Sequence, residues 1–322
     1  MSNLESVSIT SSRTNHPFTD ADQAVMAQVP AMVEPNKGKL RGVAARPIFD
    51  DIIRHTVTPE GVNFGEGEVG GVPGWWAEPE GAATDRVILH LHGGWFNWGA
   101  AEAFCNFVGH VARNAVAAAF IPNYRLAPEH PFPAAALDAS ATLGGLIADG
   151  ARAVAITGDS AGGNLALALL SSAIARAPAS RSRIVGAVVL SPVTDLTLGG
   201  TSWADRAQAD PFFLKDQAQG LIDAYLAGHG PTDPASSPLF ADLTGLPPIR
   251  LHVGDAEVLL DDAVRYGERA AVAGVDAKVD VWEGMVHGFL GSVGRLQAAD
   301  AALDAIGAFL RDRLSFGRHL PS

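Results

Sequence analysis

The sequence predicts an α/β protein with a mostly parallel central sheet, helices flanking that sheet and a helical cap. Short apolar runs alternate with longer helix-like segments along most of the chain, as in parallel strands joined by crossover helices. The 322 residues, 48% of them hydrophobic, can bury one large core. One interval between apolar runs is too long for a simple crossover, which favours a cap inserted above the sheet.

The N-terminal part predicts an arm followed by helix. The first residues, about fifteen of them, are rich in Ser, Thr and Asn and have little to bury, so we expect a loosely held arm. Thr19 or Asp20 can cap a helix whose apolar stripe runs from Val25 to Val33, before Pro and Gly break the pattern. We assign residues 1–50 to this arm and to cap helices.

Eight strands follow from the apolar pattern. The glycine-rich stretch at 62–76 alternates weakly, which predicts two short antiparallel strands. The remaining candidates are the apolar runs at 86–92, 117–122, 153–158, 184–191, 249–254 and 277–283. Because helix-like segments separate most of these runs, we expect them to pair in parallel.

The long interval between the fourth and fifth of these runs carries the helix-like "KDQAQGLIDAYLAG", bounded by Asp-Pro and Gly-Pro breakers. We interpret residues 196–239 as the cap insertion. The main α/β domain is then formed by residues 51–195 and 240–316.

Composition restricts the partners. The formal charge is −12, and no run of Lys and Arg is present, which disfavours nucleic acid and anionic membrane surfaces. No apolar run approaches the roughly 18 residues of a membrane span, and the first residues lack the pattern of a signal peptide. We therefore expect a cytoplasmic protein that acts on a small, neutral or mildly apolar molecule.

A nucleophile is predicted where the run at 153–158 meets a helix. Ser160 lies between Gly158 and Gly162, and this Gly-x-Ser-x-Gly pattern is typical of a sharp turn that lifts a hydroxyl above a sheet. The following helix directs its N-terminus at the serine and favours negative charge there. The amide of Ala161 is then one donor to a developing oxyanion.

A serine hydroxyl needs a base, and in such a sheet the acid and then the histidine follow it in the chain. Four histidines lie beyond Ser160. His319 is in the terminal tail, His252 lies within a strand pattern and His229 lies in the insertion. His287 falls between the last strand and the last helix, where its ring can reach the serine, and we expect it to be the base.

The other oxyanion donors are expected in "LHLHGGWFNWG". His92, Gly93 and Gly94 directly follow a strand, and glycines permit the close approach of a carbonyl oxygen. We expect His92 itself to be structural, because the loop needs a fixed shape and a base is already present.

These motifs resemble those of the bacterial hormone-sensitive-lipase-like esterases, family IV of the α/β-hydrolase superfamily. The resemblance spans about residues 60 to 310. It is carried by His92 to Trp95, which resembles the His-Gly-Gly-Gly loop, and by "YRLAPE", "GDSAGGNLA", "SPVTDL" and "EGMVHGF", which occur in the family's order. It implies an α/β-hydrolase fold and a catalytic main domain.

One position departs from the family pattern. The family's oxyanion donors at the second and third glycines correspond to Gly94 and Trp95. Tryptophan is not expected to take the positive φ that glycine can. Either the loop tolerates it, or the register shifts and Gly93 donates.

Two residues compete as the acid. Asp255 has the side chain that most of the family uses. Glu257 begins "EVLLD", which is similar to the family's Asp-Pro-Leu-x-Asp, whereas Asp255 stands two residues too early. We expect Glu257, with Asp255 as the alternative.

The resemblance implies a serine carboxylesterase that hydrolyses esters of short or medium chain through an acyl-enzyme, with no cofactor and no metal. Trp95, Phe96 and Trp98 are expected to crowd the substrate pocket, with packing beneath the cap as the alternative for these rings. Lactone hydrolysis is a second possibility, and a ligand-binding protein on the same fold is disfavoured because Ser160 and His287 are both present. A homodimer is left open.

Overall fold

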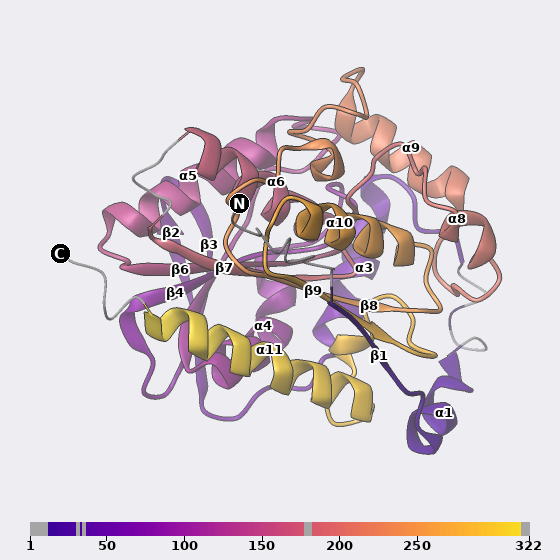
Figure 1. Ribbon diagram of the computed structural model, residues 1–322, viewed down its shortest axis with the longest axis horizontal. Helices are drawn as coiled ribbons and strands as arrows, with labels where there is room; N and C mark the ends of the chain where they lie inside the picture. The colour runs from indigo at the N-terminus through magenta and orange to yellow at the C-terminus, as the bar shows by residue number, and fades with distance from the viewer. Residues whose placement is uncertain (1–11, 30–32, 34–36, 177–181, 317–322) are drawn as a thin grey trace, which may run out of the picture.

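The computed structural model describes residues 12–29, 33, 37–176 and 182–316. Within them, nine strands form one sheet in the order β1-β9-β8-β7-β6-β4-β5-β3-β2 (Figure 1). The strands are β1 Ser12–His16, β2 Val62–Val69, β3 Val72–Pro79, β4 Ala83–Leu91, β5 Ala117–Pro122, β6 Ala153–Asp159, β7 Ile184–Leu190, β8 Ile249–Gly254 and β9 Ala277–Trp282.

The predicted strands pair in the parallel and antiparallel arrangement that we expected. Strands β1 and β4 to β9 pair with one another in parallel. The antiparallel pairs are β2 with β3 and β3 with β5. The eight strands predicted from apolar patterning are all present. Strands β5 and β6 are buried along almost their whole length, which is why they stand out as continuous apolar runs.

Helices cover both faces of the sheet (Figure 1). Helices α4 (Ala101–Ala115) and α11 (Gln297–Phe316) pack together on one face, and α5 (Ala134–Ala148), α6 (Ser160–Arg176) and α10 (Leu260–Val272) lie on the other. Each face has its own cluster of buried apolar side chains. Among the described residues, no helix is both long and apolar enough to cross a bilayer.

The predicted insertion contains α8 (Ser202–Asp205), α9 (Lys215–Leu226) and the short η3 (Pro238–Phe240). The segment that precedes η2 (Val43–Ala45) and α3 (Arg46–Arg54) contacts it. Gln217 of α9 donates to the carbonyl of Leu40, and Arg41 forms an ion pair with Asp216. Residues 40 and 41 therefore lie against the insertion, although the domain boundaries themselves stay a prediction.

The N-terminal arm differs from the expectation. Residues 12–16 form β1, an edge strand of the central sheet, where we expected a loose arm. Thr19 caps α1 (Asp20–Met26), as predicted, but the helix packs against α11, on the face of the sheet that α4 and α11 cover. The rest of the predicted stripe lies partly outside the described residues. The expectation that everything before residue 50 forms an arm and cap helices is therefore wrong for β1 and α1.

Candidate active site

The turn between β6 and α6 presents Ser160. Its φ is 54°, a left-handed conformation that is strained for a non-glycine residue. A Cβ on Gly162 would collide with the carbonyl oxygen of Leu91 in β4, so α6 can start this close to the sheet only with glycine there. The sharp turn predicted from the Gly-x-Ser-x-Gly pattern is present.

Glu257 and His287 meet across two loops at the carboxyl end of the sheet. His287 Nδ1 lies 2.8 Å from Glu257 Oε2. The other carboxylate oxygen, Oε1, accepts hydrogen bonds from the Ser191 hydroxyl and the Gly254 amide, each at 2.7 Å. Glu257 is fully buried, so both of its oxygens are held in place.

Asp255 has a different set of contacts. Its Oδ1 accepts a hydrogen bond of 2.6 Å from the amide of Gly284, in the loop that leads to His287. Its amide donates to the carbonyl of Trp282 at the end of β9. Asp255 therefore connects the two loops, while Glu257 contacts the imidazole.

The charges around His287 favour its protonated form. Burial lowers its pKa, but the hydrogen bond and charge of Glu257, together with the charges of Asp210 and Asp159, outweigh burial and raise the pKa above 6.5. The carboxylate thus stabilises an imidazolium, which a histidine becomes when it accepts a proton.

The hydrogen bonds of the loop after β4 distinguish between the candidate oxyanion donors. The amide of Gly93 donates to Asp159 Oδ1 at 3.0 Å, so it is already occupied. Among the described residues, the amides of Gly94 and Trp95 have no hydrogen-bond partner. The alternative in which the register shifts and Gly93 donates is therefore not supported, and the direct correspondence with Gly94 and Trp95 remains.

Trp95 adopts the conformation that we did not expect of it. Its φ is 52°, and that of Phe96 is 61°. Both residues are thus left-handed without being glycine, so the expectation that tryptophan would avoid a positive φ was wrong. Both side chains are buried, and their packing offsets the strain.

Known proteins match this chain over the region that holds these residues. A family model described as the alpha/beta hydrolase fold matches residues 88–291. An acetyl-hydrolase of Streptomyces hygroscopicus is 36% identical over 239 residues, which are 73% of this chain and 78% of that protein. An esterase of Acinetobacter venetianus is 33% identical over 258 residues, 79% of this chain and 84% of that protein.

Solved structures of esterases also match this chain. An esterase from the bacterial hormone-sensitive lipase family is 34% identical, with a TM-score of 0.83, over 90% of this chain and 98% of that one. This chain belongs to the bacterial hormone-sensitive lipase family of α/β hydrolases. The resemblance drawn from the sequence motifs is confirmed.

Phe96 and Trp98, which we predicted to line the substrate pocket of this hormone-sensitive lipase family member, pack against neighbouring residues instead. The ring of Phe96 stacks on Tyr225 of α9, with centroids 3.8 Å apart. Trp98 donates from Nε1 to the carbonyl of Gly42 and packs on Phe49. Neither ring lines the cavity beside His287, so the structure supports packing beneath the cap for both.

His92 is structural, as expected. It is fully buried, its ring stacks on Tyr124 at 4.2 Å, and the Tyr124 hydroxyl donates to its carbonyl at 2.6 Å. Burial lowers its pKa to about 4, so the ring is neutral at pH 7.

A cavity of about 60 Å³ lies beside His287. Asp159 and Ser191 contribute its polar side, and Phe104, Phe107 and Leu190 are among its apolar lining. A larger groove of about 470 Å³ between η3 and α10 contains none of the predicted site residues.

Phe213, from the insertion, was not predicted. Its ring lies edge-on to His287, with centroids 4.9 Å apart, and edge-on to Trp95 at 5.4 Å. It therefore contacts both the histidine and the oxyanion loop. Its sequence context, Phe-Phe after Asp-Pro, gave no indication of this position.

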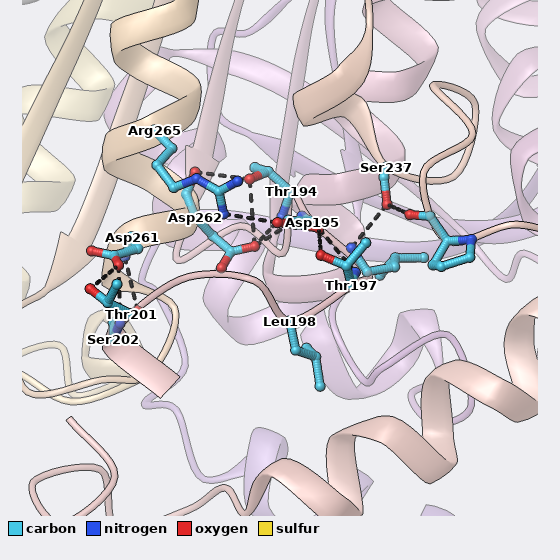
Figure 2. A network of polar contacts seen from close by, with 12 residues as sticks. Thr194, Asp195, Thr197, Leu198, Thr201, Ser202, Ser237, Asp261, Asp262 and Arg265 are labelled. Carbon is cyan, nitrogen blue, oxygen red and sulfur yellow. Dashed lines mark hydrogen bonds and ion pairs between the residues drawn. The ribbon is translucent and has the colours of Figure 1, made fainter. Parts of the chain in front are cut away.

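The insertion also forms hydrogen bonds with the loop that carries Glu257. The buried carboxylate of Asp210 accepts from the amide of Val258 at 2.9 Å, and the Ser202 hydroxyl donates to the carbonyl of Val258 at 2.6 Å. At the start of α10, Asp261 and Asp262 accept from the chain that enters the insertion (Figure 2). Val258, the residue after Glu257, is thus held by hydrogen bonds from the insertion.

Proposed function

We propose that this protein is a serine carboxylesterase with Ser160 as nucleophile, His287 as general base and Glu257 as the acid. The observations that carry the proposal are the 2.8 Å contact between His287 Nδ1 and a fully buried Glu257, and Ser160 at the strained turn between β6 and α6. The names of the relatives, acetyl-hydrolase and esterase, support the same reaction.

In this mechanism the hydroxyl oxygen of Ser160 attacks the ester carbonyl while His287 accepts the hydroxyl proton. The oxyanion that forms is stabilised by the amides of Gly94, Trp95 and Ala161. The tetrahedral intermediate then breaks its bond to the alcohol, which leaves with the proton from His287. A water molecule, deprotonated by the same imidazole, then attacks the acyl-serine. The imidazolium returns its proton to the Ser160 oxygen as the bond to the acyl group breaks and the acid leaves.

Esters of short to medium chain fit the surroundings best. The buried ring of Trp95 in the oxyanion loop, and the ring of Phe213 edge-on to both Trp95 and His287, restrict the space next to the histidine. The acetyl-hydrolase among the relatives is in keeping with a small acyl group.

The test is Ser160→Ala, assayed with p-nitrophenyl acetate, butyrate and octanoate. We expect the variant to fold normally and to lose turnover by several orders of magnitude, keeping a residual of roughly 10³-fold over water. Ser172→Ala, on the same helix, is the matched control and keeps full activity. Turnover in Ser160→Ala above a tenth of the wild-type value would refute the proposal.

A further inference from the structure

The oxyanion loop contains two consecutive left-handed residues, Trp95 and Phe96, neither of which is glycine. Such a conformation is unfavourable for any residue with a Cβ, and a protein retains it only where neighbouring groups hold it. The amide of Trp95 is one of the proposed oxyanion donors. What holds this pair therefore determines where that donor lies.

Tyr225 of α9 contacts the second residue of the pair. Its ring lies almost parallel to that of Phe96, with an interplanar angle of 8° and centroids 3.8 Å apart. The Tyr225 side chain is fully buried, and within the described part of the chain its hydroxyl has no hydrogen-bond partner. The ring, and not the hydroxyl, is what makes the contact.

Asn97 ties the same loop to the same helix. Its side-chain nitrogen donates to the carbonyl of Trp95 at 2.6 Å and to the carbonyl of Leu221, in α9, at 3.0 Å. The carbonyl of Phe96 in turn accepts from the amide of Ala127 at 2.9 Å. Helix α9 therefore meets the left-handed pair through both a ring and a hydrogen-bonded amide.

We propose that Tyr225 is a positioning residue for the oxyanion hole: by stacking on Phe96 it keeps the amide of Trp95 aimed at the oxyanion. The cap helix would then be part of the catalytic framework and not only a cover for the substrate. This inference rests on the proposed esterase mechanism and adds to it the role of α9.

The proposal predicts which kinetic constant changes. An oxyanion donor acts on charge that is present in the transition state and not in the bound ester, so a misplaced donor lowers kcat and leaves KM nearly unchanged. A tyrosine that merely supported the fold would lower stability without this selective loss.

The experiment compares Tyr225→Phe, which keeps the ring, with Tyr225→Leu, which removes it. Tyr266→Leu is the matched control, because Tyr266 is equally buried but lies in α10. For each variant kcat and KM are measured with p-nitrophenyl acetate, the melting temperature is recorded, and inhibition is measured with an alkyl trifluoromethyl ketone. That ketone forms a charged hemiketal on the serine and so reports on the oxyanion hole.

We expect Tyr225→Phe to retain wild-type kcat and Tyr225→Leu to lose about 10- to 100-fold, less than the roughly 10²- to 10³-fold cost of deleting a donor outright. Affinity for the ketone should fall by a similar factor, and KM should change little. Tyr266→Leu should lower only the melting temperature. If Tyr225→Leu does not fold, Tyr225→Met replaces it.

Three results would overturn the inference: a ringless variant with wild-type kcat, an equal loss in Tyr225→Phe, or a loss confined to KM. An inactive wild-type protein would instead contradict the proposed function, so the two failures are distinguishable.

Discussion

At the scale of single residues, the two acids that follow β8, Asp255 and Glu257, have separate roles. Glu257 contacts His287 Nδ1, whereas Asp255 accepts from the amide of Gly284 and joins two loops. Glu257→Gln should lower kcat by roughly 10⁴ with the fold retained, because an amide cannot stabilise the imidazolium. Asp255→Asn is the matched control and should cost far less. Steady-state kinetics check this, and the opposite ranking would reassign the acid to Asp255.

The charges around His287 also fix the acid limb of the pH profile. The base must be neutral to accept the proton of Ser160, so activity falls as the pH drops through its pKa. Since Glu257, Asp210 and Asp159 raise that pKa above 6.5, we expect kcat/KM to reach half its maximum at a pH above 6.5. A midpoint below pH 6.5 would show that burial outweighs these carboxylates.

Some of these residues could be predicted from the sequence and others could not. Ser160 and His287 stand in short motifs whose spacing follows from the turn and the loop that carry them. The left-handed conformation of Trp95 could not be predicted, because it depends on packing against residues far away in the chain. Phe213 is such a residue, about 120 positions away, and it contacts both Trp95 and His287.

At the scale of elements, strands that are buried on both faces were predictable and the edge strand was not. β6 is a run of apolar residues because the sheet buries it. β1, "SRTNH", contributes backbone hydrogen bonds to the edge of β9 and needs no apolar pattern for that. The carbonyl of His16 accepts from the amide of Glu283, and the Phe18 ring lies against Gly284, so this arm also contacts the histidine loop.

Helix α1 provides a test of how the arm is anchored. The buried carboxylate of Asp22 accepts from the amides of Gln297 at 2.7 Å and Ala298 at 3.2 Å, and so caps the start of α11 from another helix. Asp22→Ala should cost about 1–2 kcal/mol of unfolding free energy. By calorimetry this is a fall of about 1.5–3 °C in the melting temperature, because a chain of 322 residues unfolds with an entropy of about 0.7 kcal/mol/K. Asp20→Ala, exposed in the same turn, is the control, and an equal effect of both substitutions would contradict this anchor.

At the scale of the whole molecule, the insertion and the main domain are connected through the start of α10. Asp262 is fully buried there, and its Oδ1 accepts from the amides of Thr194 at 2.7 Å and Asp195 at 3.0 Å, where the chain enters the insertion (Figure 2). Its Oδ2 has no hydrogen-bond partner among the described residues. Burial raises the pKa of Asp262 to about 7.

This pKa predicts how stability depends on pH. Between the ordinary pKa of 3.8 and about 7, the folded state holds a proton on Asp262 that the unfolded state does not. Its contribution to stability is therefore full below about pH 4 and is lost as the pH rises to about 7, an effect of up to about 4 kcal/mol.

Asp262→Asn, which cannot ionise, should lack this dependence. In urea denaturation the wild type should lose stability relative to Asp262→Asn between pH 5 and pH 8. The control is Asp261→Asn, at a half-buried neighbour. Because this variant keeps the Asp262 carboxyl, it should lose stability over this range as the wild type does. A difference between wild type and Asp262→Asn that stays constant from pH 5 to pH 8 would show that Asp262 is charged in the folded protein throughout this range.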